Sequence, residues 1–230
     1  MGASSATEQR ERTIAAAAGI AGAVLLAMYF LAPAFLAWPY TGASPEAIVA
    51  YAGDHAALFF GGAWLQATGT LLSIVLFLAL VHLAEAGGSL DGMVAVLGSA
   101  VLLATVVIEA AFLVAVPIAA AAGDASTAAV MFALSNGVFL RVFPLAPASA
   151  TLIALGLVLR RSNLLGPSLA TVGLALGIAF EAAGIAAIFS AAALVLVAIL
   201  SAGQAIWVVA ASIRLGSAGR GAVAVSEPQS

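Results

Sequence analysis

The chain has 230 residues, of which 64% are hydrophobic and only 7% charged, and its formal net charge is −3. A typical soluble domain is about 45–50% apolar and about 25% charged, so a water-soluble fold of this length could not bury so much apolar surface. Intrinsic disorder is excluded because disordered chains are polar and charged. No basic run is long enough to bind nucleic acid, and no cysteine is present for a disulfide or a thiolate metal site. The composition predicts an integral membrane protein.

Six apolar segments are long enough to cross a bilayer, which requires about 20 residues each. They must be helices, because backbone groups in hydrocarbon have to form hydrogen bonds within their own segment. The fourth contains Pro144 and Pro147, so we expect an outer amphipathic section followed by a kinked spanning section. The predicted spans are residues 14–36, 57–83, 93–121, 127–159, 164–188 and 191–213.

The arginines predict the orientation of these spans. Six of the seven flank spans at one membrane face, and the positive-inside rule makes that face cytoplasmic. The expected fold class is therefore an all-α membrane protein, a bundle of six transmembrane helices with both termini cytoplasmic. Its domain covers residues 14–213, between a cytoplasmic tail at 1–13 and a disordered cytoplasmic tail at 214–230. The flanking residues are Arg10, Arg12, Arg160, Arg161, Arg214 and Arg220.

The first span is expected to be retained. Residues 32–34 (Ala-Pro-Ala) resemble a signal-peptide cleavage site, but the apolar run before them is longer than the usual 7–15 residues. In the outer loop that follows, Ser44 as N-cap, Pro45 in the first turn and Glu46 near the positive helix end predict a short surface helix. An aromatic belt is expected at Trp38, Tyr40 and Tyr51.

Three charged residues fall inside predicted spans: Glu109 in the third, Arg141 in the fourth and Glu181 in the fifth. A charge at the centre of a lone helix costs about 2.5–3.5 kcal/mol, and pairing one Arg with two Glu would remove most of that cost. All three lie in the outer half of their spans. We therefore predict a buried polar cluster or an outward-opening cavity, in which loss of Arg141 destabilises the protein and loss of either Glu partly rescues it.

Uncharged polar residues are expected to join this cluster. Gln66 belongs to a small, polar stripe with Thr70 and Ser73, Gln204 lies close to Ser201, and Asn136 precedes Arg141. Gly173 and Gly177 form a small-residue stripe leading to Glu181, which predicts a helix-packing face. The predicted cluster is Glu109, Arg141, Glu181, Gln66, Gln204 and Asn136.

Other candidate sites are weaker. His82 and Glu85 could be half of a metal site or an acid/base pair, but an interfacial pair facing water is the simpler interpretation. Asp54 and His55 could begin a catalytic pair, yet no recognisable nucleophile motif accompanies them. We expect no metal and no cofactor.

Two sequence motifs lie around the fourth and fifth spans. Residues 139–144 (Phe-Leu-Arg-Val-Phe-Pro) are followed by residues 156–167 (Gly-Leu-Val-Leu-Arg-Arg-Ser-Asn-Leu-Leu-Gly-Pro). This resembles a bacterial six-helix membrane family classed as a domain of unknown function, although Gly166-Pro167-Ser168 replaces the Pro-Arg that usually follows the turn. The resemblance covers about residues 12–215 and implies a bacterial cytoplasmic membrane. It implies no activity and no catalytic residue.

Three functions compete at this point. The first is a non-enzymatic protein that binds or moves a small ligand through the outer-half polar cluster. The second is a membrane-embedded enzyme in which Glu109 or Glu181 acts as a general acid on a lipid or isoprenoid. The third is a structural or assembly subunit. We favour a non-enzyme whose partners are membrane lipid and a small-molecule or lipid ligand, without nucleic acid; the sequence leaves the oligomeric state open.

Overall fold

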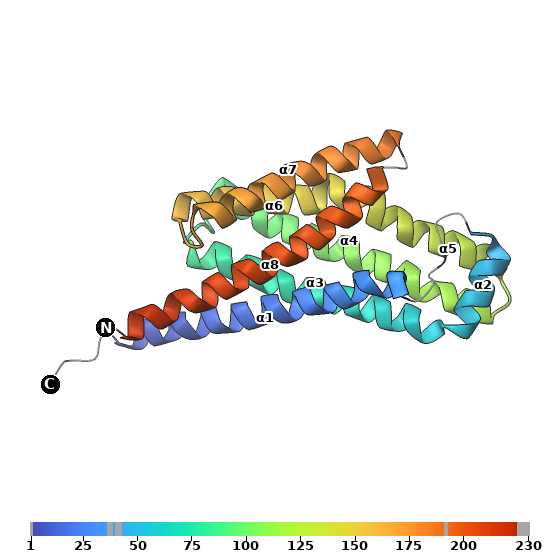
Figure 1. Cartoon of the computed structure of the whole chain (residues 1–230), viewed down its shortest axis with the longest axis horizontal. Helices are drawn as coiled ribbons and strands as arrows, with labels where there is room; N and C mark the ends of the chain where they lie inside the picture. Colours follow the sequence, from blue (N-terminus) through green and yellow to red (C-terminus); the bar gives the residue numbers. More distant parts are fainter. Residues whose placement is uncertain (1, 36–38, 40–42, 191–192, 225–230) are drawn as a thin grey trace.

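The computed structural model describes all residues except 1, 36–38, 40–42, 191–192 and 225–230. Every regular element in this described part is helical (Figure 1). The helices are α1 (Gly2–Phe35), α2 (Pro45–Asp54), α3 (Ala56–Leu83), α4 (Leu90–Ala121), α5 (Ala125–Gly137), the π-helices η1 (Val138–Val142) and η2 (Pro144–Ala148), α6 (Ser149–Ser162), α7 (Pro167–Phe189) and α8 (Ala193–Ala224).

Six helical segments are long and apolar enough to span a membrane, which confirms the predicted number. Many of their large apolar side chains point outward; Trp64 is 60% exposed and Ile206 is 71% exposed. A water-soluble monomer rarely exposes apolar surface on this scale, whereas lipid solvates it. The segments are Ala6–Leu31, Ala56–Leu83, Leu90–Ala121, Ala125–Ser162, Pro167–Phe189 and Val195–Ala218.

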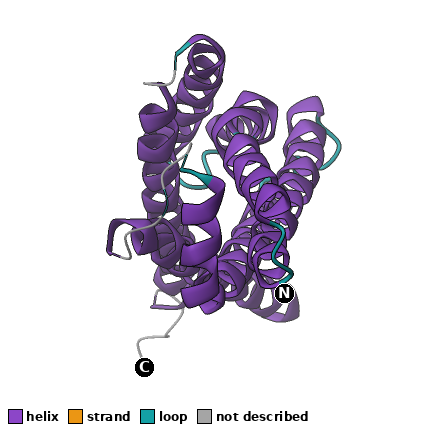
Figure 2. Ribbon diagram, turned by 90° about the vertical axis from the view of Figure 1, so that its right-hand side faces the viewer, coloured by secondary structure: helices purple, strands orange, loops and turns teal. Residues whose placement is uncertain are grey.

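The helices form one elongated bundle. α1 packs between α3 and α8, α4 packs against α3, α5 and α6, and α7 packs against α6 and α8. The start of α1 and the end of α8 lie side by side at one end, and α2 lies across the other (Figure 1). Seen from the α2 end, the described helices are joined by short loops (Figure 2).

Both tails are more helical than we predicted. α1 begins at Gly2 and α8 continues to Ala224, so the helices extend well beyond residues 14 and 213. At the first end, Arg12 Nη2 lies 2.7 Å from Glu8 Oε1, an i,i+4 pair of the kind that supports an exposed helix. Helix α8 therefore includes residues 214–224 of the predicted tail, and residues 225–230 lie outside the described part.

The predicted surface helix is confirmed as α2. Ser44 is its N-cap, with Oγ accepting a hydrogen bond from the Ala47 backbone N–H at 3.3 Å, and Pro45 stands in the first turn. Ile48 and Ala52 are buried beneath it. Of the predicted aromatic belt, Tyr51 lies on α2, and Trp38 and Tyr40 are outside the described residues.

The buried apolar residues form two separate cores. The larger one runs through the bundle and includes Phe77, Leu155 and Trp207. The smaller one lies beneath α2, where Phe59 of α3 and Phe132 of α5 are fully buried. Around it, α5 and the adjoining ends of α3 and α4 extend beyond the nearby ends of α7 and α8 (Figure 1). The bundle therefore carries a helical cap at its α2 end.

The fourth segment is not a regular α-helix at its prolines, and its backbone hydrogen bonds show why. The N–H of Phe143 bonds to the Val138 carbonyl at 2.9 Å, and the N–H of Ala148 bonds to the Phe143 carbonyl at 3.0 Å. These i to i−5 bonds define π turns. Pro144 and Pro147 have no N–H, and a proline ring clashes with the carbonyl four residues earlier, so the wider turn relieves both problems.

Candidate ligand-binding cavity

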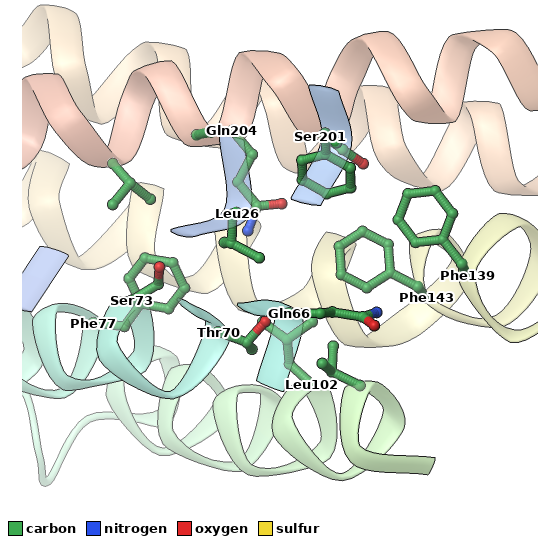
Figure 3. Close-up of a pocket in the computed structure, with 14 residues that line it drawn as sticks. Leu26, Gln66, Thr70, Ser73, Phe77, Leu102, Phe139, Phe143, Ser201 and Gln204 are labelled. Atoms are coloured by element: carbon green, nitrogen blue, oxygen red, sulfur yellow. The ribbon is translucent and has the colours of Figure 1, made fainter. Parts of the chain in front are cut away.

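A cavity lies in the middle of the bundle, between α1, α3, α4, η1 and α8 (Figure 3). None of its lining residues is charged. One part of the wall is apolar and includes Leu26, Phe77 and Leu102; the other part is polar but uncharged. The polar lining residues are Gln66, Thr70 and Ser73 of α3 and Ser201 and Gln204 of α8.

Two side-chain oxygens in this wall have no hydrogen-bond partner among the described residues. They are Oε1 of Gln66, a residue that is 2% exposed, and Oε1 of Gln204, a residue that is 8% exposed. The two side chains reach into the cavity from opposite helices (Figure 3). A buried acceptor without a partner costs about 1–3 kcal/mol. The cavity therefore presents two acceptors that a molecule with N–H or O–H groups would satisfy.

The free space inside the cavity is small. It measures about 30 Å³, counted as the space open to the centres of water molecules. One water occupies about 10–15 Å³, so the cavity as it stands accommodates about two or three waters. A larger molecule requires its walls to move apart.

A buried carboxylate stands directly behind Gln66. Glu109 of α4 is 1% exposed. Gln66 Nε2 donates to Glu109 Oε2, and the Tyr29 hydroxyl of α1 donates to Oε1 at 3.1 Å. Three helices thus converge on one acidic group. Gln66 joins this group to the cavity, because its amide nitrogen faces Glu109 while its amide oxygen is unpaired.

Aromatic rings line the side of the cavity formed by η1 (Figure 3). The Phe139 ring lies 5.6 Å from that of Phe30 on α1 and 5.8 Å from that of Phe143, measured between centroids. Phe143 in turn meets Phe180 of α7 edge-on at 5.7 Å. Phe139 is part of η1 and Phe143 joins η1 to η2, so the irregular backbone of the fourth segment carries this wall of the cavity.

The predicted pairing of Arg141 with two acids differs from the structure. Arg141 is exposed and forms no ion pair with any described residue. Glu181 is half-buried and accepts a hydrogen bond from the Ser149 hydroxyl at 2.6 Å. The prediction rested on the shared depth of the three residues, and depth does not determine which face of a helix a side chain occupies. The π turns of η1 and η2 also change the angular spacing of the residues around Arg141.

The remaining predicted cluster residues separate into two groups. Gln66, Gln204 and Glu109 lie at or behind the cavity wall. Asn136 does not line the cavity and donates to the Phe132 carbonyl of its own helix at 2.9 Å.

The glycine stripe of α7 lies at helix contacts. A Cβ added at Gly177 would be 2.6 Å from the Ile153 backbone nitrogen of α6. A Cβ at Gly173 would be 3.1 Å from the Trp207 ring of α8. The Trp207 N–H donates to the Leu169 carbonyl at 2.9 Å, which also links α8 to α7.

The weaker candidates lie apart from the central cavity. His82 is exposed and lies 3.5 Å from Glu11 of α1, measured from Nε2 to Oε2. His55 Nδ1 lies 3.1 Å from the Tyr51 carbonyl at the end of α2. Within the described residues, no group of three or more His, Asp or Glu side chains could hold a metal ion.

Sequence reasoning missed Tyr29 and Ser149, the hydroxyls that bond to the carboxyl groups of Glu109 and Glu181. Neither had a specific signal in the sequence. Tyr29 is the one tyrosine within the predicted first span, close to its outer end, and Ser149 follows the two prolines of the fourth span. Both look like ordinary interfacial or helix-bending residues until the three-dimensional packing pairs them with an acid.

A comparison of the chain with models of protein families, with curated proteins and with solved structures finds no match. The class of the protein therefore follows from its own fold. The protein has six apolar helices, exposed apolar side chains on the outside of the bundle and polar groups buried inside it. These features define a multi-pass membrane protein. The resemblance to a bacterial six-helix family remains a prediction from sequence.

Proposed function

We propose that this membrane protein binds a small, uncharged, hydrogen-bonding molecule in the central cavity and moves it between the cavity and one membrane face. The observation that carries the proposal is the pair of unpartnered amide oxygens of Gln66 and Gln204. Ligand pockets typically combine an apolar wall with a few convergent polar groups, and this cavity has that composition.

The chemistry of the lining supports a neutral ligand. A charged molecule would need an opposite charge in the wall, and none is present among the lining residues. Two acceptors favour a molecule that donates two hydrogen bonds, such as a primary amide, a small diol or water itself. The apolar part of the wall, for example Leu102 and Val106, suits a short hydrocarbon portion.

Movement of the ligand requires the cavity to open, and the fourth segment is the element best suited to this. Interrupted helices beside a site are common in transporters. η1 and η2 are π-helical, and η1 contributes Phe139 to the cavity wall. We infer that the fourth segment shifts to admit the ligand from the outer half of a bacterial cytoplasmic membrane, which assumes the predicted orientation and family resemblance.

Cysteine labelling tests this proposal, because the chain has no native cysteine. Ser201→Cys places a thiol in the cavity wall, and Ser99→Cys is its control. Both serines are buried, at 2% and 1% exposed, and both donate to the carbonyl four residues earlier, but Ser99 does not line the cavity. Purified membranes would be treated with a small, membrane-impermeant thiosulfonate reagent added from the outside.

We expect the thiol at position 201 to react at a measurable rate and the thiol at position 99 to remain unmodified. Urea, acetamide and glycerol are the probe ligands. Any of them that binds in the cavity should, at high concentration, slow the reaction at position 201. Equal rates at the two positions, or no reaction at either, would contradict an accessible cavity.

A further inference from the structure

The acid behind the cavity has no charge partner. Glu109 is 1% exposed, and its two hydrogen-bond donors, the Tyr29 hydroxyl and the Gln66 amide, are neutral. No ion pair among the described residues includes it. An ionised carboxylate buried in an apolar bundle without a cation is costly. A bound proton removes that cost.

The charged and titratable groups on neighbouring elements do not provide the missing cation. Tyr29 is the titratable group in hydrogen-bond contact with Glu109. Arg141 of η1 is exposed and unpaired within the described residues. No ion pair among the described residues joins any of the others to Glu109. They are Glu8, Arg10, Glu11 and Arg12 of α1, Glu46, Tyr51 and Asp54 of α2, His55 between α2 and α3, His82 of α3, Asp91 of α4, Asp124 at the start of α5, Arg160 and Arg161 of α6, and Glu181 of α7.

We propose that Glu109 is a reversible proton-binding site and that Gln66 transmits its protonation state to the cavity. This inference rests on the proposed function, because it gives that cavity its regulation. In the ionised state, both carboxylate oxygens accept hydrogen bonds, so Gln66 turns its nitrogen toward Glu109 and its oxygen is left for the cavity.

Protonation reverses this arrangement. The carboxylate takes one proton from a hydronium ion, which becomes water, and the resulting carboxylic acid has an O–H that is a donor. The Gln66 amide then turns over, its oxygen accepts from the acid, and its NH₂ group faces the cavity. One wall of the cavity changes from acceptor to donor, so the affinity for a ligand that donates hydrogen bonds falls when the proton binds.

A proton suits this site better than a metal cation. Metal cations such as Ca²⁺ take six or more oxygen ligands. At Glu109, the two neighbouring side chains direct an O–H and an N–H toward the carboxylate. The adjacent cavity has room for about two or three waters, and Gln66 lies between this space and Glu109.

Infrared difference spectroscopy on the full-length protein in lipid nanodiscs tests the proton site directly. A spectrum at high pH subtracted from one at low pH should contain the carbonyl stretch of a protonated, buried carboxylic acid. Glu109→Gln should remove this band, and the control Glu181→Gln should retain it, because Glu181 is half-buried and bonded to Ser149 instead. A band unchanged by Glu109→Gln would overturn the proposal.

Two further measurements sharpen the result. Replacing sodium chloride by a large organic cation chloride should leave the band unchanged, and displacement of the band by sodium would overturn a proton site in favour of a cation site. If Glu109→Gln fails to fold, Tyr29→Phe provides the second variant. It removes one hydrogen bond to Oε1 and should move the band to higher wavenumber; an unmoved band would count against Glu109 as its source.

The link to the cavity has its own readout. At one fixed pH, Ser201→Cys should react several-fold faster or slower in the Glu109→Gln background than in the wild-type background, and equal rates would overturn the link. The two proposals fail differently. A titrating band with an unreactive thiol refutes the ligand cavity alone, whereas a reactive thiol without a Glu109 band refutes the proton site alone.

Discussion

At the scale of single residues, some buried polar groups of the protein have hydrogen-bond partners and others do not. Glu109 has two donors, and Gln66 supplies one of them. Gln204 lies across the cavity with an unpaired oxygen. Loss of a partnered group and loss of an unpartnered group should therefore have opposite effects on stability.

The first prediction compares the two glutamines. Gln204→Leu removes an unpaired buried acceptor and should leave the free energy of unfolding unchanged or raise it by about 1 kcal/mol. Gln66→Leu removes a hydrogen-bond donor to Glu109 and should lower the free energy of unfolding by about 1–3 kcal/mol. Thermal unfolding in detergent, followed by circular dichroism, measures both variants. Equal destabilisation by the two substitutions would mean that Gln204 has a structural partner.

The second prediction concerns Arg141. Because this side chain is exposed and unpaired among the described residues, Arg141→Ala should change the free energy of unfolding by no more than about 0.5 kcal/mol. Its effect should add to that of Glu181→Gln, since the two groups do not interact directly. If Glu181→Gln rescued the stability of Arg141→Ala, the result would support the Arg141–Glu181 ion pair predicted from the sequence alone and contradict the structure.

At the scale of helices, close packing depends on glycine at a few crossings. The third prediction uses Gly177, where an added Cβ would meet the backbone of α6 at 2.6 Å from Ile153 N and 2.9 Å from Ser149 O. Gly177→Ala should lower stability by about 1–3 kcal/mol, as overpacking generally does. Gly61→Ala is the matched control within α3, because nothing lies within 4 Å of its added Cβ. Similar losses in both variants would show that helix separation is not the cause.

The fourth prediction concerns pH at the start of α5. Asp124 is the N-cap, and its pKa is lowered from 3.8, first by the Thr127 backbone N–H and then by the hydroxyls of Thr127 and Ser126. A lowered pKa means that this stabilisation is present above pH 3.8 and is lost as the pH falls through the folded-state pKa.

Hydrogen exchange of the first turn of α5 measures this loss. Amide protection there should fall in acid in the wild-type protein. Asp124→Asn keeps an N-cap oxygen but cannot titrate, so its exchange should show no such step. An acid step of equal size in the variant would assign the effect to another group.

At the scale of the whole molecule, the sequence predicted what composition and length determine. The six spans and the α2 helix follow from apolar runs and from the Ser44-Pro45-Glu46 signal. The polar stripe with Gln66, and Gln204 on the sixth span, pointed to what became the cavity wall. These signals are local, since each depends on residues within one helix.

The features that the sequence did not predict depend on contacts between distant segments. Tyr29 reaches Glu109 across 80 positions, and no pattern within the first span marks that contact. The face of Arg141 depends on π turns that arise where two prolines meet the packing of α7 and α4. Charge balance suggested an ion pair, but neutral hydroxyl and amide donors satisfy the acids instead.

The last prediction tests the orientation of the entire bundle through the two ends of α7. Ser162 lies just before this helix, Ser190 just after it, and both are exposed. Arg160 and Arg161 adjoin the first end, and Arg161 forms an ion pair with Asp91 in the first turn of α4. The positive-inside rule therefore puts Ser162 in the cytoplasm and Ser190 outside.

With no native cysteine, Ser162→Cys and Ser190→Cys can each be labelled in intact cells and in inverted vesicles. An impermeant maleimide should label position 190 in cells and position 162 in inverted vesicles. The reverse labelling pattern would show that the bundle has the opposite orientation in the membrane. The cap at the α2 end would then face the cytoplasm, and the ligand of the central cavity would enter from the inner half of the membrane.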